Sequence, residues 1–149
     1  MFAQVAPPPF SLTLSSSEKV IKAGSEARLE IVLKNTSNHE FSITKSNAED
    51  RAESHYRIDV RDSKGRPVPD TEYAHTVWNL NSKPTTQFVF SEVVHTLKPG
   101  ESLTDVVVIT KLYELSRPGK YTIRISREIS RELGKGTVKS SPFTITVTK

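Results

Sequence analysis

Hydrophobic and polar residues alternate along most of this chain. In the clearest run Leu29, Ile31 and Leu33 alternate with residues that are mostly charged, and in an extended strand this spacing puts all three aliphatic side chains on one face. The same period of two recurs in residues 10–14, 41–43, 56–60, 121–125 and 143–147. Residues 88–94 and 103–109 are more continuously apolar, which is typical of central strands covered on both faces. The pattern predicts about eight strands.

Short segments that contain glycine separate the predicted strands, and they occur at residues 23–25, 63–65, 98–101, 118–120 and 134–136. Glycine tolerates the positive φ that tight turns need, and proline presets its own φ. Residues 47–54 and 127–133 fit a helical turn, but neither has an apolar stripe long enough for a core helix. Many short strands joined by such turns predict an all-β, immunoglobulin-like antiparallel β-sandwich.

A Gly-x-Tyr step from Gly119 to Tyr121 opens one of the strongest strand patterns. In sandwiches of this class, a tyrosine where the chain crosses between sheets packs its ring in the core. Its hydroxyl bonds to backbone a few residues upstream, which makes a tyrosine corner. We predict this structural role for Tyr121, with Gly119 just ahead of it; the alternative is a plain core residue.

The chain has 149 residues and no cysteine, so we expect one domain that folds without disulfide bonds. Residues 1–9, which include three prolines, are predicted to be a flexible lead-in, and residues 10–149 to form the single domain. No apolar run approaches the roughly 20 residues that span a bilayer. The small residues ahead of the prolines resemble the start of a mature exported chain, periplasmic or extracellular, from which a signal peptide has been removed. A cytoplasmic start is the alternative.

Catalytic and metal-binding spacings are missing from the sequence. Its four histidines, at positions 39, 55, 75 and 95, form no His-x-His or His-Glu-x-x-His motif. There is no Gly-x-Ser-x-Gly elbow, and residues 134–137 lack the upstream glycine of a phosphate loop, so a hairpin turn is the better interpretation. Residues 35–37, Asn-Thr-Ser, form a glycosylation sequon, but they lie where a predicted strand ends, and Asn and Thr are expected there as turn formers. We expect no enzyme activity, catalytic residue, metal or cofactor.

Positive charge is concentrated in residues 111–139, which hold eight Lys and Arg against three Glu, whereas the rest of the chain holds 13 basic against 14 acidic residues. This surplus predicts a candidate basic face, made of Arg124, Arg127, Arg131 and Lys135, that would attract an anionic surface or polymer. The alternative is a set of solvated strand faces that discourage edge pairing. The stretch lacks the stacking aromatics of a nucleic-acid module, so nucleic acid is disfavoured as a partner.

Residues 66–86 form a long segment with a faint strand pattern, and we predict that it is the recognition loop. Its candidate interaction residues are Arg66, Pro67, Tyr73, His75 and Trp78. Binding tends to reside in long loops on a rigid sandwich, and tryptophan is a frequent interface anchor. The alternation of residues 75–80 leaves a second interpretation, in which Trp78 is the core tryptophan of an edge strand.

Four motifs occur in a fixed order at residues 29–38, 56–65, 97–101 and 118–121. In this order they resemble the intracellular proteinase inhibitor BsuPI family, over roughly residues 27–126. The resemblance implies an immunoglobulin-like fold and inhibition of a proteinase. That family usually carries an aromatic residue close to the turn at Gly65, where this chain has Arg66-Pro67-Val68-Pro69.

Two functions follow as expectations. The first is a non-catalytic module that binds another protein or a surface polymer through loops at one end of the sandwich. The second is a proteinase inhibitor, in which the stiff segment 66–69 docks into a protease cleft.

Overall fold

The computed structural model describes residues 8–46, 55–75, 92–129, 133–134 and 136–149. In these ranges the strands are β1 (Phe10–Ser15), β2 (Val20–Lys22), β3 (Arg28–Asn35), β4 (Phe41–Ser46), β5 (Arg57–Arg61), β6 (Glu92–Leu97), β7 (Ser102–Val108), β8 (Gly119–Glu128), β9 (Thr137–Lys139) and β10 (Phe143–Thr148). A short helix, α2 (Ile109–Leu112), joins β7 to β8, and residues 72–75 are also helical.

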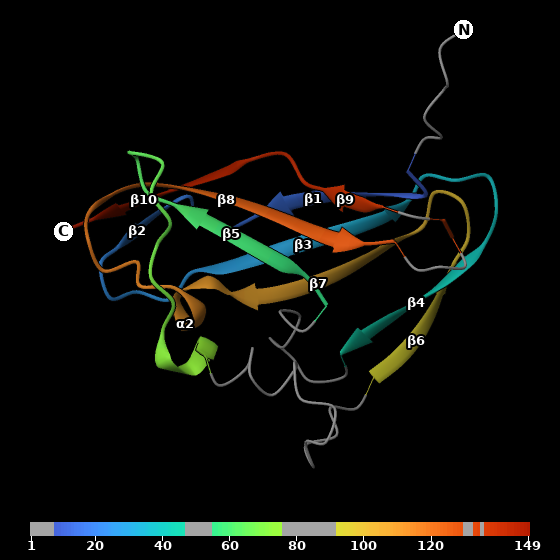
Figure 1. Ribbon diagram of the computed structural model, residues 1–149, viewed down its shortest axis with the longest axis horizontal. Coiled ribbons are helices and arrows are strands. Elements are labelled where there is room, and N and C mark those ends of the chain that lie inside the picture. The colour runs from blue at the N-terminus through green and yellow to red at the C-terminus, as the bar shows by residue number, and fades with distance from the viewer. Residues whose placement is uncertain (1–7, 47–54, 76–91, 130–132, 135) are drawn as a thin grey trace, which may run out of the picture.

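The strands form two main sheets and a separate ribbon. One sheet has the order β1-β3-β7, and the other has the order β2-β10-β8-β5 with β9 beside β8. Among the described strands, all pairs are antiparallel except β10 with β2, which is parallel. Strands β4 and β6 pair with each other, at the end of the molecule opposite α2 (Figure 1).

The hydrophobic core of the described residues lies between the two sheets. It contains Leu29, Ile31 and Leu33 from β3 together with Ile123 and Ile125 from β8, all of which are fully buried. The alternation predicted for both strands is therefore confirmed. Because the two sheets bury one face each against a shared core, the fold is an all-β, immunoglobulin-like sandwich.

Two expectations about the strands need correction. Strand β7 was expected to be central, but it ends the order β1-β3-β7. In β6 the side chains of Val93 and Val94 are 38% and 63% exposed, so this strand is not covered on both faces. Valine is enriched in strands, and its contribution depends on whether the strand lies at the edge or in the centre of a sheet, so an apolar run alone does not fix a strand's place in a sheet. Residues 88–91 lie outside the described residues.

The helical turn expected over residues 127–133 is wrong at its start, because Arg127 and Glu128 are the last residues of β8. The turn expected at residues 47–54 lies outside the described residues. Strands β8 and β9 pair antiparallel, as the hairpin predicted at residues 134–136 requires, but residues 130–132 and 135 of the connection lie outside the described residues. The sequence pattern does not predict the short strands β2 and β9, because three residues are too few to show a period-two alternation of hydrophobic and polar side chains.

The lead-in expected to be flexible through residue 9 is attached to the sandwich at its last two residues. The backbone N–H of Thr36 donates to the carbonyl of Pro9 at 3.1 Å, and its hydroxyl donates to the carbonyl of Pro8 at 3.1 Å. In the described part of the chain, no helix has the length and apolar character needed to cross a membrane.

Asn35, the first residue of the sequon, has a structural role at the end of β3. Its side chain is fully buried, and Nδ2 donates to the carbonyls of His39 at 2.9 Å and Leu97 at 2.8 Å. Its Oδ1 accepts from the backbone N–H of Ser37 at 2.9 Å and from the Ser37 hydroxyl at 2.7 Å. Asn35 thus ties the turn after β3 to the end of β6, and this structural role is what the Asn-Thr-Ser sequence serves.

Candidate functional site

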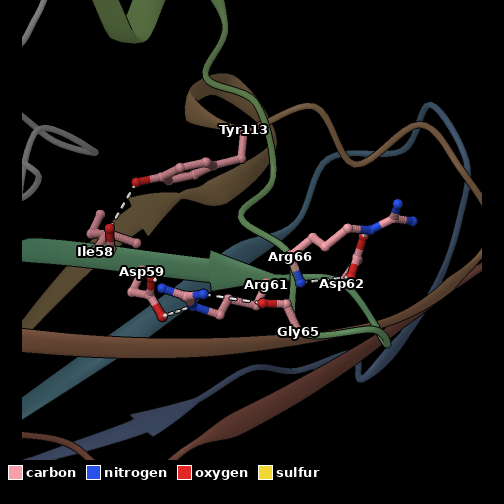
Figure 2. Close-up of polar contacts among 7 residues, drawn as sticks. All are labelled: Ile58, Asp59, Arg61, Asp62, Gly65, Arg66 and Tyr113. Carbon is pink, nitrogen blue, oxygen red and sulfur yellow. Dashed lines mark hydrogen bonds and ion pairs between the residues drawn. The ribbon is translucent and has the colours of Figure 1, made fainter.

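The turn after β5 is organised by the carboxylate of Asp62. Its Oδ1 accepts from the backbone N–H of Lys64 at 2.9 Å and of Arg66 at 3.0 Å, and Gly65 supplies the positive φ of 79° that the turn needs. Figure 2 shows the Arg66 guanidinium beside this carboxylate, at 3.3 Å. The backbone hydrogen bond from Arg66 is the main cause that lowers the pKa of Asp62, with smaller contributions from Lys64 and the Arg66 charge.

The segment that follows this turn lies along the free side of β5. The N–H of Val68 donates to the carbonyl of Val60 at 3.0 Å, and the Val68 side chain is buried in the core. The N–H of Glu114 donates to the carbonyl of Pro69 at 3.0 Å. Residues 66–69 are therefore held on both sides, and the segment is not an open loop.

Tyr113 covers another part of the exposed edge of β5. Its hydroxyl donates to the carbonyl of Ile58 at 2.8 Å (Figure 2). Burial raises the pKa of Tyr113, and the negative charges of Asp70 and Asp59 raise it further. With the carbonyls of both Ile58 and Val60 occupied, β5 offers little backbone for pairing with another strand.

Residues 117–121 show the geometry of a tyrosine corner. The Tyr121 ring is buried, and its hydroxyl donates to the carbonyl of Arg117 at 2.5 Å. Gly119 begins β8 with a φ of 147°. The corner follows α2 at the crossing from one sheet to the other, which is where immunoglobulin-like sandwiches carry it.

A groove of about 550 Å³ lies between these two anchored segments. Its lining residues are Asp62, Ser63, Lys64, Arg66, Pro67, Val68, Pro69, Asp70, Glu114, Ser116, Arg117, Pro118, Gly119, Lys120 and Tyr121. The pairing of Arg61 with Thr122 sets the turn at residues 62–66 beside residues 117–121. The bridge between Asp70 and Tyr113 sets the other end beside Glu114.

Charge is distributed unevenly along this groove. Lys64, Arg66, Arg117 and Lys120 outnumber Asp62 at the end formed by the turn, and Asp70 and Glu114 lie at the end near α2. Arg66 is paired with Asp62, whereas Lys64, Arg117 and Lys120 form no ion pair within the described ranges.

A second hollow of about 290 Å³ continues from the acidic end. It shares Glu114 and Ser116 with the groove and adds Glu26 and Thr71. Thr71 also fixes the helical residues 72–75, because its hydroxyl accepts from the N–H of Ala74 at 3.1 Å as an N-cap does.

The predicted interaction residues separate into two groups. Arg66 and Pro67 line the groove, together with the structural pair Gly119 and Tyr121. Tyr73, at 40% exposed, and His75 are on the helical residues 72–75 and do not line it. His75 is therefore helical and not extended, and Trp78 lies outside the described residues, so its role stays a prediction.

The predicted basic face is wrong for Arg127. Arg124 is exposed, but Arg127 lies three residues further along β8 and only 8% of it is exposed. Successive residues of a strand point to opposite faces, so these two side chains cannot share one. The Arg127 guanidinium donates to the carbonyl of Thr44 at 2.9 Å and lies over the Tyr56 ring. Arg131 and Lys135 lie outside the described residues.

Arg127 belongs to a buried polar cluster that the sequence did not reveal. The Tyr56 hydroxyl donates to the carboxylate of Asp105 at 2.6 Å, and Lys45 Nζ lies 3.8 Å from that carboxylate. Burial raises the pKa of Tyr56, and the Asp105 charge raises it further. Among the residues that the structure describes, no three His, Cys, Asp or Glu side chains are grouped to hold a metal ion.

Comparisons with known proteins add only distant likenesses. No protein-family model matches the chain, and no curated protein does. The CARDB domain of the PF1109 protein from Pyrococcus furiosus, solved in complex with di-metal ions, is 12% identical with a TM-score of 0.46, over 95% of this chain and 89% of that one. BslA, a bacterial hydrophobin, is 13% identical with a TM-score of 0.40, over 97% and 99%. The sheet order and the tyrosine corner, rather than these likenesses, define the fold described above.

Proposed function

We propose that this protein is a non-catalytic binding module that holds a protein segment or an anionic surface polymer in the groove between residues 62–70 and 114–121. The observation that carries the proposal is the set of four cationic side chains around one end of that groove, three of them without an ion pair in the described ranges. Arg66 comes from the predicted interaction segment, and Arg117 and Lys120 come from the basic stretch.

The walls of the groove are already held in place, which supports a binding role. Asp62 fixes the turn, Val68 is paired with β5, and Tyr121 fixes Arg117. A site on anchored backbone loses little conformational entropy when a ligand arrives. Cations without partners also attract an oppositely charged ligand over a distance set by the ionic strength.

Two probes test the proposal: fluorescent polyglutamate for an acidic polypeptide, and heparin for an anionic polymer. We expect the double variant Arg117→Ala/Lys120→Ala to lose about fivefold or more in affinity for the probe that binds. The matched control is Lys22→Ala/Lys34→Ala, which removes two exposed cations from β2 and β3. Equal losses in both variants would mean that net charge, and not the groove, binds the probe.

Proteinase inhibition is the second candidate function, and the observation that favours it is the exposed Arg66 on a turn whose backbone is held by Asp62. An inhibitor presents a stiff exposed side chain to a protease cleft. The buried Val68 limits the reactive part to the turn at residues 62–66. Titration against trypsin-like serine proteinases tests this, and an undiminished rate at micromolar protein contradicts it, whereas a loss of inhibition in Arg66→Ala supports it.

A further inference from the structure

We infer that the ligand of the groove is an extended polypeptide segment of mixed charge, with its acidic residues over Lys64, Arg117 and Lys120 and its basic residues over Asp70 and Glu114. This inference rests on the proposed function and specifies its ligand. It starts from the separation of opposite charges along one continuous surface.

The charge separation is fixed by the backbone. The register of β5 and β8 holds the cationic turn beside Arg117 and Lys120. At the other end, Glu114 is held by the hydrogen bond from its N–H to Pro69, and Asp70 by its bridge to Tyr113. Neither set of charges can move to the other end without breaking these contacts.

The negative charge of the acidic end comes from Asp70 and Glu114. The adjoining hollow also contains Glu26, but the charge of Glu26 is balanced by Arg28 at 2.8 Å. Asp70 contributes enough negative charge at this end to raise the pKa of Tyr113 further after burial. Carboxylates concentrated here repel a ligand that is negative along its whole length.

A polymer with charges of one sign therefore fits the groove poorly. A polyanion is attracted by the cations at the turn but is repelled by Asp70 and Glu114, and a polycation is attracted by these carboxylates but is repelled by the cations. A ligand with its charges separated in the same way as the groove avoids both penalties.

The surface between the charged ends favours a polypeptide over a sugar polymer. Pro67, Pro69 and Pro118 are exposed and line the groove, and their rings give flat apolar contacts. Extended peptides commonly bind such surfaces through their own backbone and side chains. A sulfated polysaccharide has neither the basic residues for Glu114 nor the apolar side chains for these rings.

Fluorescence anisotropy with labelled peptides of equal length tests the inference. One probe has its glutamates in one block and its lysines in another, and a second has the same residues in alternation. Polyglutamate, polylysine and heparin complete the set. We expect the block peptide to bind about fivefold to tenfold more tightly than any other probe, as a few additional exposed charge pairs would give.

Charge reversal locates the effect. Arg117→Glu/Lys120→Glu should abolish the preference for the block peptide and make polylysine the tighter homopolymer. Glu114→Lys should instead strengthen polyglutamate binding, and the control Lys22→Glu/Lys34→Glu should leave the order of the probes unchanged.

The outcomes separate this inference from the proposed function. If polyglutamate or heparin binds as tightly as the block peptide and is lost in Arg117→Glu/Lys120→Glu, the groove binds a ligand but the mixed-charge inference is wrong. If the block and alternating peptides bind equally, the inference is also wrong. If no probe distinguishes the groove variants from the control variant, both proposals fail.

Discussion

The hydroxyl of Tyr56 donates a 2.6 Å hydrogen bond to the buried carboxylate of Asp105, and this bond connects the two sheets of the sandwich. Tyr56 immediately precedes β5, whereas Asp105 lies in β7 of the facing sheet. The Arg127 guanidinium lies 5.1 Å from the centre of the Tyr56 ring. A polar contact between sheets therefore accompanies the hydrophobic core.

Replacing Tyr56 by phenylalanine removes the donor and leaves the Asp105 carboxylate buried with one hydrogen bond fewer. We expect Tyr56→Phe to lower the free energy of unfolding by about 1–3 kcal/mol, measured by urea denaturation. Tyr73→Phe is the matched control, because Tyr73 is 40% exposed and should change stability little. A loss in Tyr56→Phe no larger than in the control would show that this bond contributes nothing to stability.

Alkaline pH should weaken the same contact. Burial raises the pKa of Tyr56 in the folded protein, whereas a tyrosine in the unfolded chain has a pKa of about 10. The contribution of Tyr56 to the free energy of unfolding is therefore complete below about pH 10. It is lost as the pH rises above that value, by about 1.4 kcal/mol per pH unit. Urea midpoints of the wild type should converge on those of Tyr56→Phe as pH rises, and parallel curves would contradict this.

The side chain of Asn35 should be among the most sensitive polar positions. Asn35→Ala leaves the carbonyls of His39 and Leu97 without their donor, and we expect a loss of about 2–3 kcal/mol in stability. The control is Asn38→Ala, since Asn38 is exposed. The difference between the two thermal midpoints measures the effect, and similar midpoints would contradict the structural role of Asn35.

Tyr121→Phe should affect both stability and the groove. Loss of the bond to the Arg117 carbonyl should lower the free energy of unfolding by about 0.5–1.5 kcal/mol. It should also weaken binding of the block peptide, because Arg117 is then held less firmly. If anisotropy shows unchanged affinity while stability falls, the corner supports the fold alone.

The period-two pattern predicted the sandwich because alternation depends only on local geometry. It placed the core residues of β3 and β8 correctly. The same alternation also places Arg127 on the inner face of β8, because it lies two residues after the buried Ile125. The prediction of an exposed Arg127 followed its charge instead, since arginine is rarely buried.

The groove could be predicted only in part. The sequence predicts Arg66 and Pro67 as interaction residues because they belong to a long segment with a faint strand pattern. Arg117 and Lys120 were counted in the basic stretch, but sequence alone does not show that they lie opposite Arg66. That proximity comes from the register of β5 with β8, which is a long-range property of the sheet. Similarly, the bond between Tyr56 and Asp105 joins residues far apart in the chain.

Amide NMR with the block peptide tests the central claim most directly, because it reports where the ligand binds. We predict chemical-shift changes confined to residues 62–70 and 114–121, saturating with one peptide per protein molecule. Arg117→Glu/Lys120→Glu should remove these changes, and Lys22→Glu/Lys34→Glu should not. Shifts centred instead on the outer face of β3, or spread evenly over all exposed lysines and arginines, would contradict a binding site in the groove.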